Sequence, residues 1–507
     1  MKALGSIRSL AAAAALAVAA TAIAAPQSGA DSDRAAMMAQ LGITALRPGA
    51  SGNPAAPDHA NTDEARANPY PNLPDPLRLA NGEPVTSREQ WWRQRRPEIA
   101  AVYEREVYGR VPAAVPPVKW QVTATDREVI GFGTPVIARR VIGTVANSAD
   151  PAAPVRLRMT VVLPAEITRP VPVLIMFGRE AFPAPSQPSP EEFDRINAAA
   201  KAALVRQDPS LAGVFAAHQA FAIASPTPFR FPERDAHGDP PPPEQLIAAG
   251  WGYAMLDPTS AQADDGAGLT GGIIGLVNGG RRRKPDDWGA LRAWAWAASR
   301  GLDWLQRDPG VDGSHVGIEG VSRYGKAALV AMAFDERFAI GLIGSSGKGG
   351  ATPLRRNFGE GVANLATGEY HWMAGNFLRY DTKGVSSPNL DAGDLPVDAN
   401  QLIALAAPRP LFISYGSPAA GDAHWLDQRG SWMATVDASR VYALLGARGV
   451  GAGADYRTLP MPPIGTSLLD GELAWRQHEG GHTDAPNMKY FLRWAERFVR
   501  PATQAPR

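Results

Sequence analysis

The stretch HVGIEGVSRYGKAALVAMAFDERF, from His315 to Phe338, decides the fold class. It opens with a short apolar run typical of a buried strand and continues, after a serine flanked by glycines, as an alanine-rich helical segment. A serine at a strand-to-helix turn is typical of a nucleophile elbow, which holds the hydroxyl above the carboxyl end of a sheet. The usual elbow is G-x-S-x-G, whereas Gly320 and Gly325 enclose Ser322 with one extra residue. The residues alone leave two interpretations open, a catalytic nucleophile and an ordinary helix-capping serine.

Segments on both sides of this stretch also carry strand patterns. Three strand-like runs come first, and the later ones are continuous apolar runs typical of buried parallel strands. The predicted strands are residues 119–125, 136–145, 155–163, 170–178, 220–225, 252–257, 314–320 and 408–416. Antiparallel strands followed by alternating strands and helices predict an α/β fold, a three-layer sandwich with a mostly parallel central sheet.

The clearest helix is predicted to begin at Asp286. From there, apolar residues recur at steps of three and four, which places them on one helix face. They are Trp288, Leu291, Ala295, Ala298, Leu302 and Leu305. Residues 261–284, just before this helix, are glycine-rich and lack a packing pattern. They follow a predicted strand, where α/β enzymes keep substrate loops.

The composition changes twice along the chain. Residues 1–25 have a charged start, an alanine-rich apolar run and the small-x-small pattern Ala22-Ile23-Ala24, which predict a secretory signal peptide. Residues 26–85 are rich in Pro, Ala, Asn and Asp and predict a linker and a loosely wrapped N-terminal arm. The folded domain is predicted over residues 86–507, beginning with a helix capped by Ser87.

Charge and cysteine content exclude several classes of protein. With 51 Lys and Arg against 50 Asp and Glu, the net charge is +1, so no field suited to nucleic acid is expected. The chain has no cysteine, which excludes disulfides, thiolate catalysis and cysteine-ligated metals. Beyond the predicted signal peptide, no stretch approaches the about 20 apolar residues of a membrane helix. We expect a monomeric protein of the periplasm or the cell exterior, without nucleic-acid or membrane partners.

A nucleophilic serine needs a base, and two histidines lie late in the chain, in WRQHEGGHTDAPN. His478 and His482 match the zinc-protease pattern H-E-x-x-H, which requires both histidines on one face of a helix. Gly480 and Gly481 lie between them and disfavour that helix. We therefore expect no metal and a base, His482, on a flexible loop.

These motifs together resemble the glucuronoyl esterases, carbohydrate esterase family fifteen. The elbow of that family is G-C-S-R-x-G-K, which accounts for the extra residue and matches Gly320 to Lys326 with Val321 in place of Cys. The resemblance also covers residues 91–112, 286–305, 346–350, 355–360 and 395–413. It implies an α/β-hydrolase fold and a serine esterase that cleaves esters between glucuronic acid on xylan and lignin alcohols. Ser322 matches the family's nucleophile and His482 its base.

The resemblance also assigns roles around the elbow. It implies that Arg323 stabilises the oxyanion, that Lys326 and Glu369 contact the sugar, and that Trp425 donates its indole N–H to the uronate ring. Glu360 falls at a neighbouring polar position for the sugar. The alternatives are a surface Arg, a solvated Lys, a core Trp and structurally paired carboxylates. Both cations lie in the first turn of the predicted helix, where the macrodipole disfavours them, and this favours a functional role.

The chain departs from the family pattern at the triad acid. Many relatives place a Glu before S-G-x-G-G, but Ser345 occupies that position here. Some bacterial members place the acid after the next strand, so we choose Asp422 and keep Asp427 as the alternative. Asp484 and Glu479, which flank the histidine, are expected at most to pair with arginine. If no acid is present, turnover falls by about 10⁴, as in serine proteases that lose the orienting group.

Three functions remain. The first is an exported esterase for (4-O-methyl-)glucuronic acid esters, acting without cofactor on glucuronoxylan or lignin–carbohydrate esters. The second is an acetyl- or feruloyl-type xylan esterase, which the sugar-binding set on the acyl side disfavours. The third is a weakly active carbohydrate-binding pseudoenzyme, which Ser345 suggests and the retained Ser322, Arg323 and His482 oppose.

Overall fold

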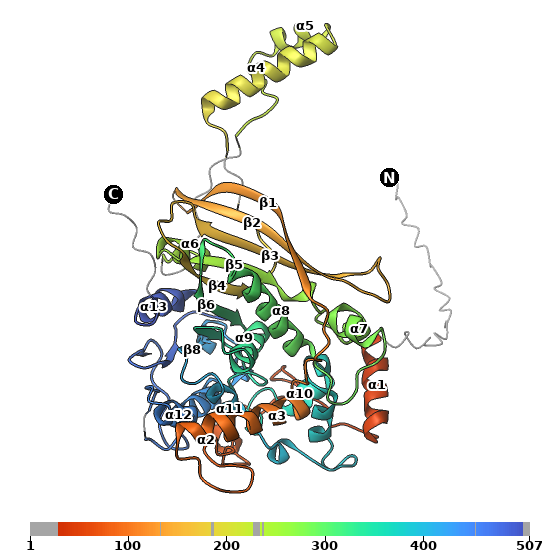
Figure 1. Cartoon of the computed structure of the whole chain (residues 1–507), viewed down its shortest axis with the longest axis vertical. Helices are drawn as coiled ribbons and strands as arrows, with labels where there is room; N and C mark the ends of the chain where they lie inside the picture. Colours follow the sequence, from red (N-terminus) through yellow and green to blue (C-terminus); the bar gives the residue numbers. More distant parts are fainter. Residues whose placement is uncertain are drawn as a thin grey trace, which may run out of the picture.

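Ten strands form a single sheet in the order β1-β2-β3-β5-β4-β6-β7-β8-β10-β9 (Figure 1). The computed structural model describes residues 29–131, 133–183, 187–226, 234–235, 238–451 and 453–499. The strands are β1 Val118–Ile130, β2 Thr134–Val145, β3 Val155–Pro164, β4 Val171–Phe177, β5 Gly252–Asp257, β6 Val311–Val321, β7 Gly341–Gly344, β8 Leu411–Tyr415, β9 Ser467–Leu468 and β10 Leu473–Gln477. Neighbours from β5 through β4, β6, β7 and β8 to β10 are parallel, and β1, β2, β3 and β9 add antiparallel edges. The predicted sheet is confirmed.

The central strands are apolar on both faces, which makes the fold a three-layer sandwich. Along β4, Val173 and Ile175 pack into the larger core, whereas Leu174 and Met176 pack into the smaller core on the other face. The larger core takes its helical side chains mainly from α8 Ala290–Leu305, α9 Arg323–Phe334, α11 Ala399–Ala404 and α12 Gln428–Leu444. The smaller core is covered by α6 Pro242–Ala248 and α13 Ala485–Ala495. A strand buried on both faces has no polar side, which explains the continuous apolar runs of the sequence.

Seven further α-helices lie in the described part of the chain. They are α1 Gly29–Leu41, α2 Arg88–Gln90, α3 Arg96–Glu106, α4 Pro190–Gln207, α5 Leu211–Ala217, α7 Gly272–Asn278 and α10 Val362–Thr367. Ser87 caps α2 as predicted, in a capping box with Gln90. None of the described helices is both long and apolar enough to pass through a lipid bilayer. The predicted signal peptide lies outside the described residues.

The N-terminal arm is packed more closely than the loose wrapping that its composition suggests. Met37, Ile43, Leu79 and Val85 are buried in the larger core, and Ala67 is buried as well. Sequence patterns identify buried residues by their periodicity within one helix or strand. The buried side chains of the arm are isolated and spread over some 50 residues, so they produce no such pattern. This correction makes the arm part of the folded body.

The predicted strand at 220–225 is wrong. Those residues lack strand pairing and follow α5, in the excursion that Figure 1 shows projecting from the sheet, and Phe221 is 54% exposed. A short apolar run predicts a strand only when a neighbouring strand is available to pair with it.

The helix predicted from Asp286 begins four residues later. Gly289 is extended (φ −93°, ψ 178°), and a Cβ there would lie 2.3 Å from the carbonyl oxygen of Trp372. The segment before α8 is therefore held against another part of the chain, which overrides the helical periodicity of its apolar residues.

Candidate active site

Four neighbouring parallel strands bring the candidate site together. Ser322, Ser345, Asp422 and His482 follow the carboxyl ends of β6, β7, β8 and β10, which are adjacent in the sheet. Parallel strands end at the same edge, so the loops that follow them converge there. Residues separated by as many as 160 positions in the sequence thus meet in one region.

Ser322 adopts a backbone conformation that serine rarely takes. Its φ is 61° and its ψ is −129°, and its N–H donates to the carbonyl oxygen of Gly344 at 2.9 Å. Such a conformation costs about 1–3 kcal/mol and persists at functional sites, where the surrounding structure enforces it. The side chain does not cap α9, and its hydroxyl has no hydrogen-bond partner among the described residues. This geometry disfavours the helix-capping interpretation.

The two glycines of the elbow are required by close backbone contacts. A Cβ on Gly320 would lie 2.3 Å from the carbonyl oxygen of Tyr324, and a Cβ on Gly325 would lie 2.7 Å from that of Gly344. The second glycine thus lets α9 approach the end of β7.

The histidine loop and the loop after β8 are joined by a short hydrogen bond. His482 Nδ1 lies 2.7 Å from Asp422 Oδ1. A carboxylate only accepts, so Nδ1 carries the proton and Nε2 is left as the basic nitrogen. The Asp422 side chain is fully buried, whereas that of His482 is 37% exposed, as a base that must meet substrate requires.

Ser345 supports the carboxylate of Asp422. Its hydroxyl donates to Oδ2 at 3.0 Å, beside the N–H of Gly416 at 2.9 Å and the amide of Gln428 at 3.3 Å. The position where many relatives carry a Glu therefore holds a hydroxyl that stabilises a carboxylate placed on the next loop. Nothing in the sequence identifies Gly416 or Gln428, because a single amide or backbone donor leaves no pattern.

The alternative acids have other partners. Asp427 is buried, pairs with Arg356 at 2.7 and 3.0 Å, and accepts from the first turn of α12. Glu479 pairs with Arg476 at 3.2 Å. Asp484 lies against Glu319, and burial of the two carboxyls raises the pKa of each.

The H-E-x-x-H segment is not helical. His478 is buried, and its Nε2 lies 2.7 Å from the carbonyl oxygen of Thr483, whereas His482 faces Asp422. Burial lowers the pKa of His478. The two imidazoles thus bond to different partners, and the zinc-protease geometry is not formed.

Lys326 lies under the elbow and is buried. Its Nζ donates to the carbonyl oxygens of Ser346 and Lys348 at 2.7 and 2.8 Å and lies 3.7 Å from Glu360 Oε2. That oxygen is buried and has no hydrogen-bond partner among the described residues. Trp425 is 48% exposed, and its carbonyl oxygen accepts the N–H of Glu360, which places the two residues side by side.

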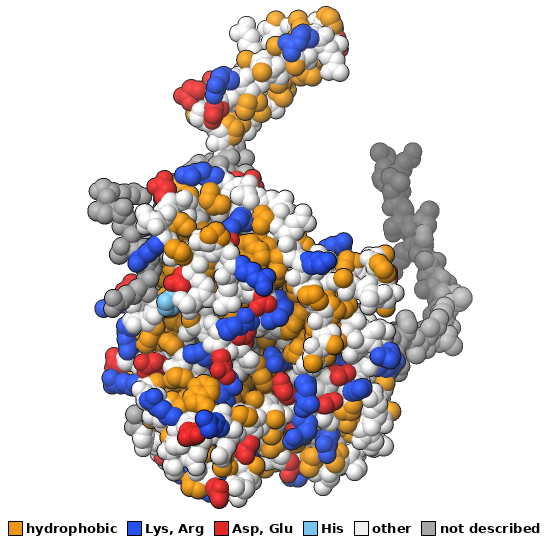
Figure 2. Space-filling model, viewed as in Figure 1, with side chains coloured by type: hydrophobic (Ala, Val, Ile, Leu, Met, Phe, Trp, Pro, Cys, Tyr) orange, Lys and Arg blue, Asp and Glu red, His pale blue; other side chains and the backbone are white. Residues whose placement is uncertain are grey.

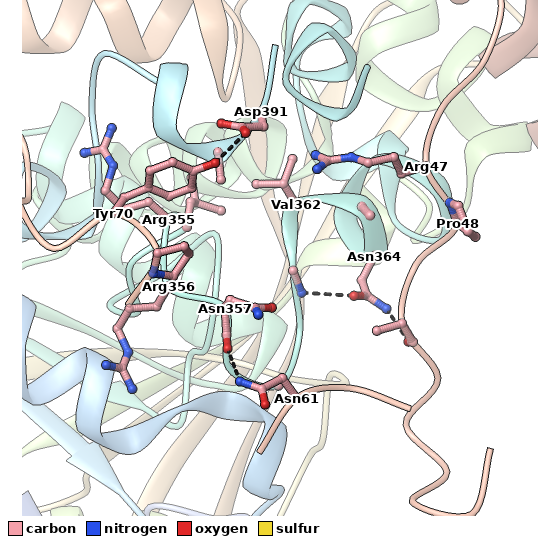
Figure 3. A pocket seen from close by; sticks show the side chains of 17 residues that line it. Arg47, Pro48, Asn61, Tyr70, Arg355, Arg356, Asn357, Val362, Asn364 and Asp391 are labelled. Carbon is pink, nitrogen blue, oxygen red and sulfur yellow. Dashed lines mark hydrogen bonds between the residues drawn. The ribbon is translucent and has the colours of Figure 1, made fainter. Parts of the chain in front are cut away.

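The segment that carries Glu360 is held by the N-terminal arm. A cavity of about 390 Å³ lies between them (Figure 3). Asn61 donates to the carbonyl oxygen of Asn357 at 2.5 Å, and the side chain of Asn364 accepts from Gly361 and donates to Ala50. These bonds fix both sides of the segment, so the arm indirectly positions a carboxylate of the site.

Arg323, the residue after the serine, is held by a carboxylate that sequence reasoning missed. Its Nη1 donates to Asp264 Oδ2 at 2.5 Å, and its guanidinium lies 5.3 Å from the ring centre of Trp372. Glu369 lies nearby, 3.9 Å from His371 Nε2, and burial raises its pKa. Asp264 belongs to residues 261–284, which the sequence predicts as a substrate loop. The sequence gives no other indication of a role for this carboxylate.

Comparisons with known proteins agree on one family. The model "Glucuronyl esterase, fungi" matches residues 283–446. A solved CE15 glucuronoyl esterase from Teredinibacter turnerae T7901 is 42% identical with a TM-score of 0.74, and the match covers 92% of this chain and 99% of that one. Carbohydrate esterase MZ0003, from an unknown prokaryotic organism, is 29% identical over 84% of this chain and 89% of its own. The 4-O-methyl-glucuronoyl methylesterase 1 of Sodiomyces alcalophilus is 33% identical over 31% of this chain and 32% of its own.

The sheet and these relatives define a carboxylic ester hydrolase of the α/β-hydrolase class. Within that class, the chain belongs to the glucuronoyl esterases of carbohydrate esterase family fifteen, because the T. turnerae relative is matched at 42% identity over nearly its whole length. The family and the fold implied by the sequence resemblance are thereby confirmed. The activity of the family is hydrolysis of glucuronic acid esters.

Proposed function

We propose that the protein is an exported serine esterase that hydrolyses esters of (4-O-methyl-)glucuronic acid, as in lignin–xylan linkages, with Ser322, His482 and Asp422 as its triad. The observation that carries the proposal is the 2.7 Å bond between His482 Nδ1 and Asp422, on loops that converge beside the strained serine. An acid on the loop after β8 thus serves in place of the Glu that Ser345 replaces.

The proposed reaction has two steps. Ser322 Oγ attacks the ester carbonyl while His482 Nε2 takes its proton, and the same nitrogen then protonates the departing alcohol. The glucuronoyl group is left on Ser322 as an ester. Water, deprotonated by His482, attacks that ester and releases the free uronate and the serine. Asp422 stabilises the imidazolium formed in each step.

Arg323 is proposed to stabilise the oxyanion. Only its Nη1 has a hydrogen-bond partner among the described residues, so Nε and Nη2 remain available as donors. The N–H of the residue after the nucleophile is a second donor in hydrolases of this fold. Removing one oxyanion donor typically lowers kcat by about 10²–10³-fold.

The acyl side is proposed to bind the sugar through Lys326, Glu360, Glu369 and Trp425. The Glu360 carboxylate is paired with the buried Lys326 and its side chain is 15% exposed, which suits a carboxylate that accepts a hydrogen bond from a sugar hydroxyl. The exposed indole of Trp425 provides an N–H and an apolar face for the uronate ring.

The substrate test compares a benzyl ester of glucuronic acid with a phenyl acetate, using the protein and its Ser322→Ala variant. Cleavage that depends on Ser322 and strongly favours the glucuronate ester is expected. Preference for the acetate would favour the acetyl-esterase alternative. Absence of Ser322-dependent cleavage of either ester would favour a carbohydrate-binding pseudoenzyme.

Export and partners complete the proposal. The segment 1–25 supports secretion. Fractionation of cells that express the full chain tests it: the protein found in the periplasm or the medium is expected to lack this segment.

On the face shown in Figure 2, basic and acidic side chains are interspersed without a large field of one sign. This supports a neutral or weakly charged polysaccharide partner rather than nucleic acid. We propose a monomer, which light scattering would verify.

A further inference from the structure

Asp264 joins three segments at the rim of the candidate site. Its Oδ2 accepts from Arg323 Nη1 at 2.5 Å, and its Oδ1 accepts from His371 Nε2 at 3.0 Å and from Trp372 Nε1 at 2.7 Å. Both carboxylate oxygens are therefore used, by donors from the start of α9 and from the turn at 370–372.

The loop that carries Asp264 is itself held in place. Gln262 is fully buried; its side chain accepts from Ile274 N at 3.1 Å and donates to Gly268 O at 2.7 Å, and its carbonyl oxygen accepts from Trp294 Nε1 at 2.8 Å. These bonds tie the loop to its own return segment and to α8. The carboxylate is thus presented from a rigid support, as a preorganised site requires.

The carboxylate stays charged at working pH. Burial acts to raise the pKa of Asp264, but the hydrogen bonds from His371, Trp372 and Arg323 outweigh it and lower the pKa to about 2. The pair with Arg323 is therefore ionic, and a charged hydrogen bond is roughly twice as strong as a neutral one.

The guanidinium is fixed on one edge and free on the other. Asp264 takes Nη1 and the Trp372 ring lies against the guanidinium plane at 5.3 Å, while Nε and Nη2 have no hydrogen-bond partner among the described residues. An arginine side chain loses about 2 kcal/mol of rotamer freedom when it is ordered, and a donor already ordered in the free enzyme does not incur that loss during reaction.

We infer that Asp264 is a positioning residue, which holds the guanidinium of Arg323 by one edge so that its other edge faces the developing oxyanion. The inference rests on the oxyanion role proposed for Arg323. Asp264 does not touch substrate; it acts through the arginine.

A cation site is the competing explanation for this cluster. Ligand atoms of Asp264, Glu369 and His371 lie within 4.8 Å of one another. The guanidinium already occupies one face of Asp264, and a divalent cation there would be repelled by it. The positioning role accounts for every hydrogen bond of the carboxylate without a second cation.

The experiment is a double-mutant cycle on hydrolysis of benzyl glucuronate with Asp264→Asn, Arg323→Ala and the double variant. Asparagine keeps an acceptor for Trp372 but loses the charge and turns an N–H toward Arg323. We expect kcat to fall about 10- to 100-fold with KM within about threefold, since small misplacements of catalytic groups cost up to about 10²-fold. The double variant should be no slower than Arg323→Ala alone.

Asp265→Asn is the matched control. Asp265 is the exposed neighbour, caps the turn at Gly268 at 2.7 Å and does not contact the arginine, so its variant should keep wild-type kcat. If Asp264→Asn does not fold, Trp372→Phe takes its place, because it removes one bond to Asp264 and keeps a ring against the guanidinium. This variant is then expected to lower kcat by a few fold in the wild-type protein and to have no effect on kcat in the Arg323→Ala variant.

The outcomes separate this inference from the proposed function. If Arg323→Ala is slow and Asp264→Asn is as fast as wild type, the positioning role is wrong and the oxyanion role stands. If Arg323→Ala is as fast as wild type, the oxyanion role is wrong and the inference falls with it. Additive losses in the double variant would mean that Asp264 acts independently of Arg323. Loss of wild-type activity in EDTA, restored by a divalent metal, would replace the positioning role with the cation site.

Discussion

At the scale of single residues, the most informative feature is that two neighbouring aspartates have different hydrogen-bond partners. Asp422 and Asp427 are five positions apart and both buried, yet one bonds to the imidazole and the other to a guanidinium. The family resemblance favoured Asp422 and kept Asp427 as the alternative, whereas the structure separates the two by their partners. Their variants should therefore fail in different ways.

Asp422→Asn should abolish turnover without unfolding the protein. The amide keeps the size of the side chain but no longer stabilises the imidazolium and can favour the wrong histidine tautomer, which costs about 10⁴ in kcat in serine proteases. Steady-state hydrolysis of benzyl glucuronate measures the loss, and circular dichroism checks the fold. Activity within tenfold of wild type would show that another carboxylate serves as the acid.

Asp427→Asn should instead lower stability. It leaves Arg356 buried without its anionic partner on that side, and breaking a buried pair costs about 3–5 kcal/mol. Urea titration measures the free energy of unfolding. The folded fraction should keep kcat within a few fold of wild type; a drop near that of Asp422→Asn would contradict the assignment.

At the scale of elements, the N-terminal arm is anchored to Asp381, whose carboxyl has a raised pKa. Arg47 donates to Asp381 Oδ1 at 3.0 Å, and the second oxygen of Asp381 is buried without a partner among the described residues. Burial, only partly offset by Arg47, raises the pKa of Asp381 to about 6. A raised pKa means that the folded state binds the proton more tightly than the unfolded chain, so this contribution to stability is present below about pH 4 and lost as pH rises through about 6.

Asp381→Asn removes that titration. The difference in melting temperature between the variant and wild type should therefore shift in favour of the variant by a few degrees between pH 4 and pH 7.5. Thermal melts at both pH values measure it. A difference that does not change with pH would mean that Asp381 stays charged across this range.

The sequence predicted the strands and helices whose periodicity is strong and the site residues that lie in motifs. The runs that became β4, β5 and β6 are buried on both faces, so composition alone identified them. The run at 220–225 has a similar apolar composition but no strand pairs with it. Pairing depends on residues distant in the sequence, so the local pattern does not predict its absence. Asp264 and Gln428 were not found because each acts through a contact between distant loops, and one carboxylate or amide in a loop looks like any other.

At the scale of the whole molecule, the first described residues behave as part of the domain rather than as a tether. A chain that begins at residue 86 lacks four buried side chains of the larger core, each worth about 1.5–3 kcal/mol if fully buried, and lacks Glu64, which pairs with Arg356 at 2.9 Å. Such a chain should be insoluble or melt well below a chain that begins at residue 26. Differential scanning calorimetry of the two chains decides; equal melting temperatures would show that the arm is dispensable.

The two edges of the ten-stranded sheet have a consequence for colloidal behaviour. A free strand edge is a template on which another molecule can add a strand, and a chain without cysteines has no disulfide crosslinks to keep such an edge closed. β9 has only two residues, too short to recruit a neighbour. β1 is long, but its pairing slips between Val122 and Ala124, and charged side chains such as Lys119 and Arg127 interrupt it. Both ends of the sheet are thus built to resist fibril-like growth, even at concentrations at which the molecules meet often.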